Sequence, residues 1–168
     1  MAFNLSLILQ LFVLLNPLSS FPVLLAAYKR KMDVPSIAVA ASVVAFIIAL
    51  SVIFFGPFLF SLYGISIDSF RVAGGVVLFL LGIDTIRPKH EEPELGEVDS
   101  LISIIATPLL TGPATISYLT LAAYDSGPWV LLPDVTLAFL AVGLVFFLFS
   151  LTIKRLNPKV VEITAKVL

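Results

Sequence analysis

The chain has 168 residues, of which 60% are hydrophobic and 12% are charged, and its mean hydropathy is +1.12. So little polar surface cannot cover a soluble fold of this length, and we expect an all-α integral membrane protein in contact with lipid. The formal net charge of −1 says little about partners, but cysteine is absent and His90 is the single histidine. Dithiol chemistry and a histidine or thiolate metal site therefore lack their side chains, and we expect no enzymatic activity, cofactor, metal or nucleic-acid partner.

Five apolar stretches are each long enough to cross a bilayer. They lie near Leu5–Tyr28, Ser36–Leu62, Phe70–Ile86, Leu101–Tyr124 and Val130–Ile153. The first stretch has no basic segment before it and continues directly into basic residues, which is unlike a cleavable signal peptide. We expect it to remain in the mature protein as the first membrane span.

The first stretch contains two prolines, in the sequence Asn16-Pro17-Leu-Ser-Ser-Phe-Pro22. A proline in a helix interior costs about 3 kcal/mol because it removes a donor and crowds the preceding turn. The carbonyls of Val13 and Leu18 are expected to lose their partners. Asn16 and Pro17 also resemble an N-cap followed by the first residue of a new half-helix. This interruption lies about 16 Å along the stretch, near the middle of a hydrocarbon core of about 30 Å.

The basic residues are distributed unequally between the two ends of the five stretches. Arg71 alone falls on one side. The other side carries Lys29, Arg30, Lys31, Arg87, Lys89, Lys154, Arg155, Lys159 and Lys166. Because loops rich in Lys and Arg stay in the cytoplasm, this distribution predicts a multi-pass protein with its amino terminus outside.

The third stretch carries small residues on one face. Gly75 and Gly82 are seven residues apart and Gly74 widens the same face, so another helix can approach closely. We expect the partner to be the small-residue stripe of the second stretch, formed by Ala38, Ala41, Ser42, Ala45 and Ala49.

Two ionisable residues near the ends of the third stretch are singled out as candidates for gating or coupling. Arg71 follows Asp68 by three residues, so a local ion pair and an external gate or substrate-attracting charge are both open readings. Asp84 is either an interfacial partner of Arg87 or, if it faces a central cavity, the carrier of a coupling proton.

The fourth stretch repeats the proline pattern of the first, as Thr107-Pro108-Leu-Leu-Thr-Gly-Pro113. Here the carbonyls of Ile104 and Leu109 are expected to lose their partners. Three crossings separate the starts of the two patterns, so the two stretches enter the membrane from opposite faces. This predicts inverted three-helix repeats, each with a proline-broken first helix, of the kind that builds transporter sites near the membrane midplane.

The polar segment Arg87–Asp99 divides the chain into a first repeat, residues 1–90, and a cytoplasmic linker with the second repeat, residues 91–168. Inversion predicts six spans, and residues 154–168 are too short for the sixth. We therefore expect that the chain is truncated, or incompletely ordered, at its carboxyl end.

The two interruptions together suit a small zwitterion, because half-helix starts favour a carboxylate while freed carbonyls accept from an ammonium. The prolines could instead only kink the helices, with Ser and Thr repairing the carbonyls. The predicted substrate-binding residues are Asn16, Pro17, Ser19, Ser20, Pro22, Thr107, Pro108, Thr111, Gly112, Pro113 and Thr115.

Three motifs in a fixed order carry a family resemblance. They are Asn16-Pro17-x4-Pro22, then Gly64-Ile65-Ser66 with Phe70–Gly75 and Leu78–Asp84, and finally Thr107–Ser117. In this respect the chain resembles the MarC-type family of small neutral amino acid transporters. The resemblance implies six spans, a prokaryotic cytoplasmic (inner) membrane and glycine or alanine as substrate.

The resulting expectation is a membrane transporter of small neutral amino acids that works by alternating access around two broken helices. A proton or a sodium ion is the expected coupling ion if there is one, and the small-residue stripe also permits a homo-oligomer. Two alternatives stay open, which are a passive channel or exporter for small polar solutes and a non-transporting structural membrane subunit.

Overall fold

The computed structural model describes residues 3–86, 98, 102, 105 and 110–153. All elements in these residues are helical, which confirms the all-α class. They are α1 (Leu5–Leu15), the 3-10 helix η1 (Pro17–Ser20), α2 (Phe21–Lys29), α3 (Val34–Tyr63), α4 (Ile67–Ile86), α6 (Pro113–Ser126) and α7 (Pro128–Ile153). The predicted linker except Val98, the predicted boundary between the repeats and residues 154–168 lie outside the described residues.

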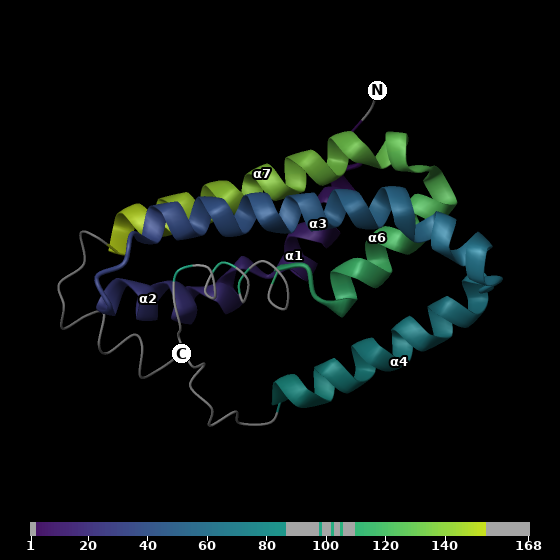
Figure 1. The fold of residues 1–168 in the computed structure, drawn as a ribbon, viewed down its shortest axis with the longest axis horizontal. Coiled ribbons are helices and arrows are strands. Elements are labelled where there is room, and N and C mark those ends of the chain that lie inside the picture. Colours follow the sequence, from purple (N-terminus) through teal and green to yellow (C-terminus); the bar gives the residue numbers. More distant parts are fainter. Residues whose placement is uncertain (1–2, 87–97, 99–101, 103–104, 106–109, 154–168) are drawn as a thin grey trace.

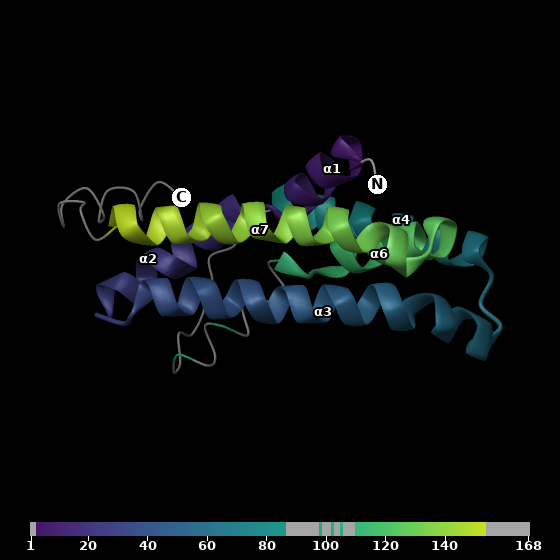
Figure 2. The same ribbon diagram turned by 90° about the horizontal axis from the view of Figure 1, so that it is seen from above.

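Two long helices, α3 and α7, form the centre of the structure and lie side by side (Figures 1 and 2). Within the described residues they are the two helices long and apolar enough to cross a membrane by length and composition. Pro35 and Pro128 lie at the starts of these helices, where a missing backbone donor costs nothing. The second and fifth predicted spans are therefore observed as long apolar helices.

The small-residue stripe of α3 lies in the core, but its partner differs from the prediction. Ala38, Ala41, Ala45 and Ala49 are fully buried, and α3 packs mainly against α7 and α6 rather than against α4. The pairing of this stripe with the glycines of α4 was therefore a wrong prediction. It failed because small residues permit close approach without specifying which helix approaches.

The contact between α3 and α6 is especially close at Gly56. A Cβ atom built on Gly56 would lie 2.8 Å from Cγ2 and 3.1 Å from Oγ1 of Thr120. A side chain at this position would force Thr120 to shift, so glycine permits the close approach of α6 to α3. Against α7, a Cβ on Gly143 would lie 3.7 Å from the side chain of Ser42 of α3, which is ordinary contact.

The helix α4 is the least embedded of the long elements. After the turn that follows α3 it runs apart from α3 and α7 (Figure 1), and within the described residues its main packing partner is α6. The turn is made by Gly64 in a left-handed conformation with φ 63°. The large side chains of Val72, Val76 and Phe79 are exposed along α4, as expected for a surface that meets lipid.

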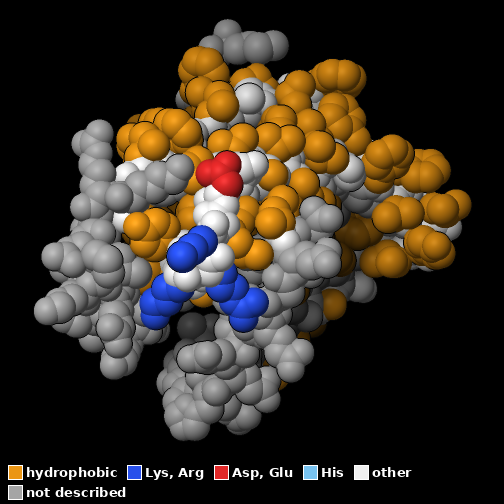
Figure 3. Space-filling view, turned by 60° about the vertical axis from the view of Figure 1, so that its left-hand side comes forward, with side chains coloured by type: hydrophobic (Ala, Val, Ile, Leu, Met, Phe, Trp, Pro, Cys, Tyr) orange, Lys and Arg blue, Asp and Glu red, His pale blue; other side chains and the backbone are white. Residues whose placement is uncertain are grey.

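Hydrophobic side chains dominate the described part of the face that Figure 3 shows, and they surround a small group of basic side chains. Lys29 at the end of α2, and Arg30 and Lys31 in the turn that follows, are exposed. Arg71 lies near the start of α4, at the other end of α3. An apolar belt between charged ends fits a protein embedded in a membrane.

Candidate functional site

The first predicted span is divided into α1, η1 and α2 instead of forming one regular helix. Asn16, between α1 and η1, adopts a left-handed conformation with φ 40° and ψ 65°. Its backbone N–H donates to the carbonyls of Phe12 and Val13 at 3.2 Å. In the same way the N–H of Phe21 donates to the carbonyl of Leu18. The prediction that the carbonyls of Val13 and Leu18 lack partners was therefore wrong, because the chain tightens locally and donors closer in sequence reach them.

The predicted N-cap at Asn16 is only partly correct. Asn16 does precede η1, with Pro17 at its first position, but the Asn16 side chain makes no capping hydrogen bond to η1. Asn16 is exposed and Pro17 is buried. The side chains of Ser19 and Pro22 lie outside the described part of the structure.

Ser20, at the end of η1, is the most unusual polar residue of this segment. Its side chain is fully buried, and its hydroxyl oxygen has no hydrogen-bond partner in the described structure. Leaving a buried hydroxyl without a partner costs about 1–3 kcal/mol. A group of this kind in a native fold calls for a functional or structural explanation.

The second predicted interruption is described from Leu110 onward, and Thr107, Pro108, Ile104 and Leu109 lie outside the described residues. The helix α6 begins at Pro113, after Gly112 in an extended conformation with φ −70° and ψ 175°. The hydroxyl of Thr115 donates to the carbonyl of Leu110 at 3.1 Å, and Thr111 is also buried. The carbonyl that accepts from Thr115 is not that of Leu109, which Pro113 was predicted to deprive of a donor.

The helices α1 and α6, which adjoin the first and the second interruption, contact each other. The Tyr118 hydroxyl of α6 donates to Oε1 of Gln10 of α1 at 2.5 Å, although neither residue was predicted to belong to the site. A cavity of about 350 Å³ lies beside this contact, between the end of α1, the first half of α4 and α6. It is lined by Leu14, Arg71, Gly74, Gly75, Ala114, Ser117, Tyr118 and Leu121.

The polar groups of this cavity come from three side chains. Ser117 and Tyr118 supply hydroxyls, and Arg71 supplies a positive charge. Leu14 is close in sequence to the interruption at Asn16, and Ala114 belongs to the first turn of α6, where backbone N–H groups and the helix dipole favour an anion. The cavity can therefore hold a small molecule that carries both a negative group and hydrogen-bond donors.

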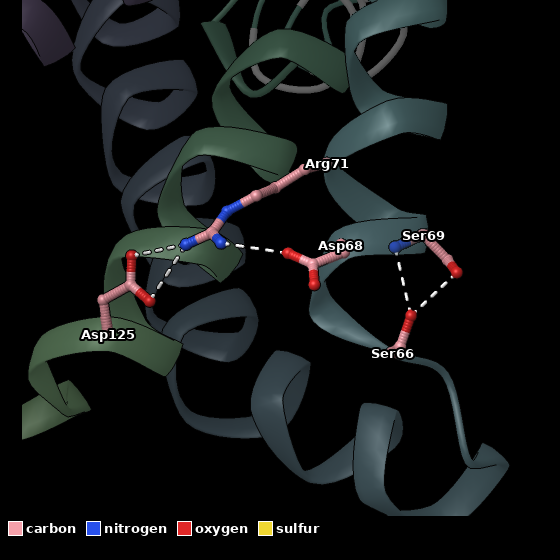
Figure 4. Close-up of polar contacts among 5 residues, drawn as sticks. All are labelled: Ser66, Asp68, Ser69, Arg71 and Asp125. Atoms are coloured by element: carbon pink, nitrogen blue, oxygen red, sulfur yellow. Dashed lines mark hydrogen bonds and ion pairs between the residues drawn. The ribbon is translucent and has the colours of Figure 1, made fainter.

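Arg71 forms the local ion pair that its spacing from Asp68 predicts. It also forms a second ion pair that the spacing does not predict. One guanidinium nitrogen lies 3.3 Å from Oδ1 of Asp68, in the same helix. The other lies 3.3 and 3.2 Å from the two carboxylate oxygens of Asp125, near the end of α6. Figure 4 shows Arg71 extending from α4 toward α6, between the two carboxylates. The side chain of Asp84 lies outside the described part of the structure.

Asp134 is an ionisable residue that sequence reasoning missed, although it interrupts the apolar run of the fifth stretch. It is buried in α7, and its Oδ1 accepts the backbone N–H of Asn4 at 3.1 Å. Because Asn4 caps α1 through its own side chain, the carboxylate lies at the positive end of that helix. Among the described residues, no three acidic or histidine side chains gather closely enough to hold a metal ion.

Comparison with known proteins gives a consistent result. A family model described as "MarC family integral membrane protein" matches residues 1–168. A UPF0056 membrane protein of Methanocaldococcus jannaschii is 30% identical over 169 residues, which covers 88% of this chain and 72% of the relative. A UPF0056 membrane protein of Aquifex aeolicus is 34% identical over 120 residues, covering 65% of this chain and 56% of the relative. No solved structure matches.

Proposed function

Since the chain belongs to the MarC family of integral membrane proteins, we propose that it carries small neutral amino acids of the glycine and alanine class across a prokaryotic cytoplasmic membrane. The mechanism is alternating access around the interruption at residues 16–20 and the start of α6. This proposal includes two inverted repeats, an outside amino terminus and a proline-broken first helix in each repeat.

The buried hydroxyl of Ser20 is the observation that carries this proposal. A membrane protein gains nothing in stability from a buried donor without a partner, and a ligand that supplies the partner removes the cost. Ser20 lies at the end of η1, in the segment where the regular helix is interrupted. It does not line the cavity described above, so a polar solute that reaches it during transport would complete a hydrogen bond that the protein leaves open.

The cavity beside α1 and α6 supports a small substrate. Its volume of about 350 Å³ is near the lower end of the range of ligand sites, about 300–1,000 Å³. The first turn of α6 and Arg71 favour a carboxylate, while the hydroxyl of Tyr118 can accept from an ammonium. Because the carbonyls of Val13 and Leu18 already have partners, this hydroxyl oxygen replaces them in our proposal as the acceptor for the ammonium.

The coupling ion and the assembly state are also proposals. A proton or a sodium ion can drive the transport, and Asp84 is our proposed carrier of a proton. Replacing Asp84 with Asn tests this assignment directly. Unchanged proton-driven uptake by the variant would rule Asp84 out as the carrier. A homo-oligomer would be detected by the mass of the purified protein in detergent.

A second function is favoured by a specific observation. The partners that the carbonyls of Val13 and Leu18 find locally are what a structural membrane subunit would show if its prolines only shaped helix packing. A passive channel is the other alternative, and it would use the same cavity as a constriction.

Counterflow in liposomes that carry the full-length protein separates these functions. Liposomes preloaded with unlabelled alanine accumulate labelled alanine against the gradient of the label if the protein is a carrier. A channel only equilibrates the label, and a structural subunit moves none. Empty liposomes give the background, and imposed proton and sodium gradients identify the coupling ion. If neither glycine nor alanine crosses faster than background under any gradient, the proposed transport is wrong.

A further inference from the structure

From the contacts between α4 and α6, we propose that the Arg71–Asp125 ion pair closes a seam between these helices and that the seam opens to give access to the cavity. We define the seam as Arg71 and Gly74 of α4 facing Ser117 and Asp125 of α6. This inference assigns a function to Asp125. Two experiments test it. The transport experiment, called the transport arm, rests on the function proposed above, whereas the labelling experiment, called the structural arm, does not.

The seam borders the cavity directly. Arg71, Gly74 and Ser117 belong both to the seam and to the cavity lining. A Cβ atom built on Gly74 would lie 3.3 Å from Oγ and 3.4 Å from Cβ of Ser117, so the two helices touch there. Separating α4 from α6 would therefore widen the cavity at once.

The ion pair is suited to a contact that breaks and re-forms. The side chains of Arg71 and Asp125 are 47% and 52% exposed, so water competes for both partners. Exposed pairs of this kind change an equilibrium by about 1.4- to 5-fold, which is enough to bias a gate without locking it. The pair also joins helices that the sequence assigns to different repeats, which must move relative to each other in alternating access.

Asp68 contributes equally to the closed and the open seam. It contacts the other guanidinium nitrogen of Arg71 from within α4, so it travels with Arg71 when the seam opens. Arg71 then keeps one carboxylate partner in the open state. The two carboxylates therefore have different effects, because only Asp125 holds the helices together.

Other contacts of this region stay in place during such a movement. The ring of Phe70, at the start of α4, packs on Phe60 of α3 with a centroid distance of 4.6 Å. The turn between these helices contains Gly64 in its left-handed conformation. This end of α4 is thus tied to α3, and the seam to α6 is the side on which it can separate.

The structural arm of the test measures access to Ser117, which is nearly buried at the seam. The chain contains no cysteine, so Ser117→Cys gives a single reactive thiol in the full-length protein. We expect Asp125→Asn to raise the rate of its reaction with a small water-soluble maleimide about 1.4- to 5-fold. Asp68→Asn is the matched control and leaves the rate unchanged, and the charge exchange Arg71→Asp with Asp125→Arg restores the slow rate. Equal rates in the two Asn variants, or no change with Asp125→Asn, would overturn the proposal.

The transport arm tests whether transport requires the seam to open, in a protein that keeps Arg71 and Asp125. The Cβ separation of 3.4 Å between positions 74 and 117 is close to that of a disulfide, so Gly74→Cys with Ser117→Cys should cross-link under mild oxidation. We expect oxidation to stop alanine counterflow and reduction to restore it. Undiminished counterflow by the cross-linked protein would show that the seam does not open. If the protein without substitutions moves no alanine, the proposed substrate fails, and the labelling rates still decide whether the seam opens.

Discussion

Replacing Ser20 with Ala shows whether Ser20 binds substrate or stabilises the fold. The two roles predict changes of opposite sign in the melting temperature. The buried hydroxyl lacks a partner in the described structure, and removing it relieves a cost of about 1–3 kcal/mol. At about 2–4 °C per kcal/mol for a chain of this size, the melting temperature of the substrate-free protein should rise by at least about 2 °C. Stability should increase while function decreases.

The functional loss follows from the hydrogen bond to the substrate. A neutral hydrogen bond contributes about 0.5–1.5 kcal/mol, so the concentration of alanine needed for half-maximal uptake should rise about 2- to 13-fold. Thermal unfolding in detergent gives the stability, and uptake into liposomes gives the concentration dependence. Both measurements use the same purified variant.

Ser150→Ala is the matched control for this experiment. Ser150 is also fully buried, but its hydroxyl donates to the carbonyl of Phe147 at 2.7 Å. Its removal should leave uptake unchanged and should not raise the melting temperature, because a formed bond is lost. If Ser20→Ala lowers the melting temperature as much as Ser150→Ala does, or leaves uptake unchanged, the reasoning about Ser20 is refuted.

Two further predictions concern the packing that positions the site. Gly56→Ala should lower the free energy of unfolding by about 1–3 kcal/mol, because its methyl group collides with Thr120. Adding Thr120→Ser should recover part of the loss, and Gly75→Ala, with open space around its Cβ, should be neutral in the same unfolding assay. Asp134→Ala should speed hydrogen exchange at the amide of Asn4, which loses its acceptor, whereas Asp134→Asn keeps an acceptor oxygen and most of the protection. Unchanged exchange in the Ala variant would contradict this anchoring function.

The long helices could be predicted from the sequence because apolar length and terminal prolines determine them locally. The second stretch was expected at Ser36–Leu62 and α3 spans Val34–Tyr63, while the fifth was expected at Val130–Ile153 and α7 spans Pro128–Ile153. The ends differ by a few residues because a proline fits the first turn of a helix, where its missing donor is not needed.

The partners within the site could not be predicted in the same way. Arg71 contacts Asp125 and Gln10 contacts Tyr118 across 54 and 108 residues of sequence, and nothing local in either pair specifies the other member. The freed carbonyls were predicted wrongly for a related reason. A proline removes a donor by rule, but which neighbouring donor replaces it depends on how tightly the chain turns, as the left-handed Asn16 shows.

The two faces of α6 differ in how much free energy their separation costs. Toward α3, the closely packed Gly56 and Thr120 belong to a buried interface, where losing contacts of single side chains costs about 2–5 kcal/mol each. Toward α4, the contact relies on an exposed ion pair worth about 0.2–1 kcal/mol and on Gly74 against Ser117. Since the cavity lies on the α4 side, the movement that costs least is also the one that exposes it. A transporter needs this arrangement, because a gate on the α3 side would have to break the core each time it opened.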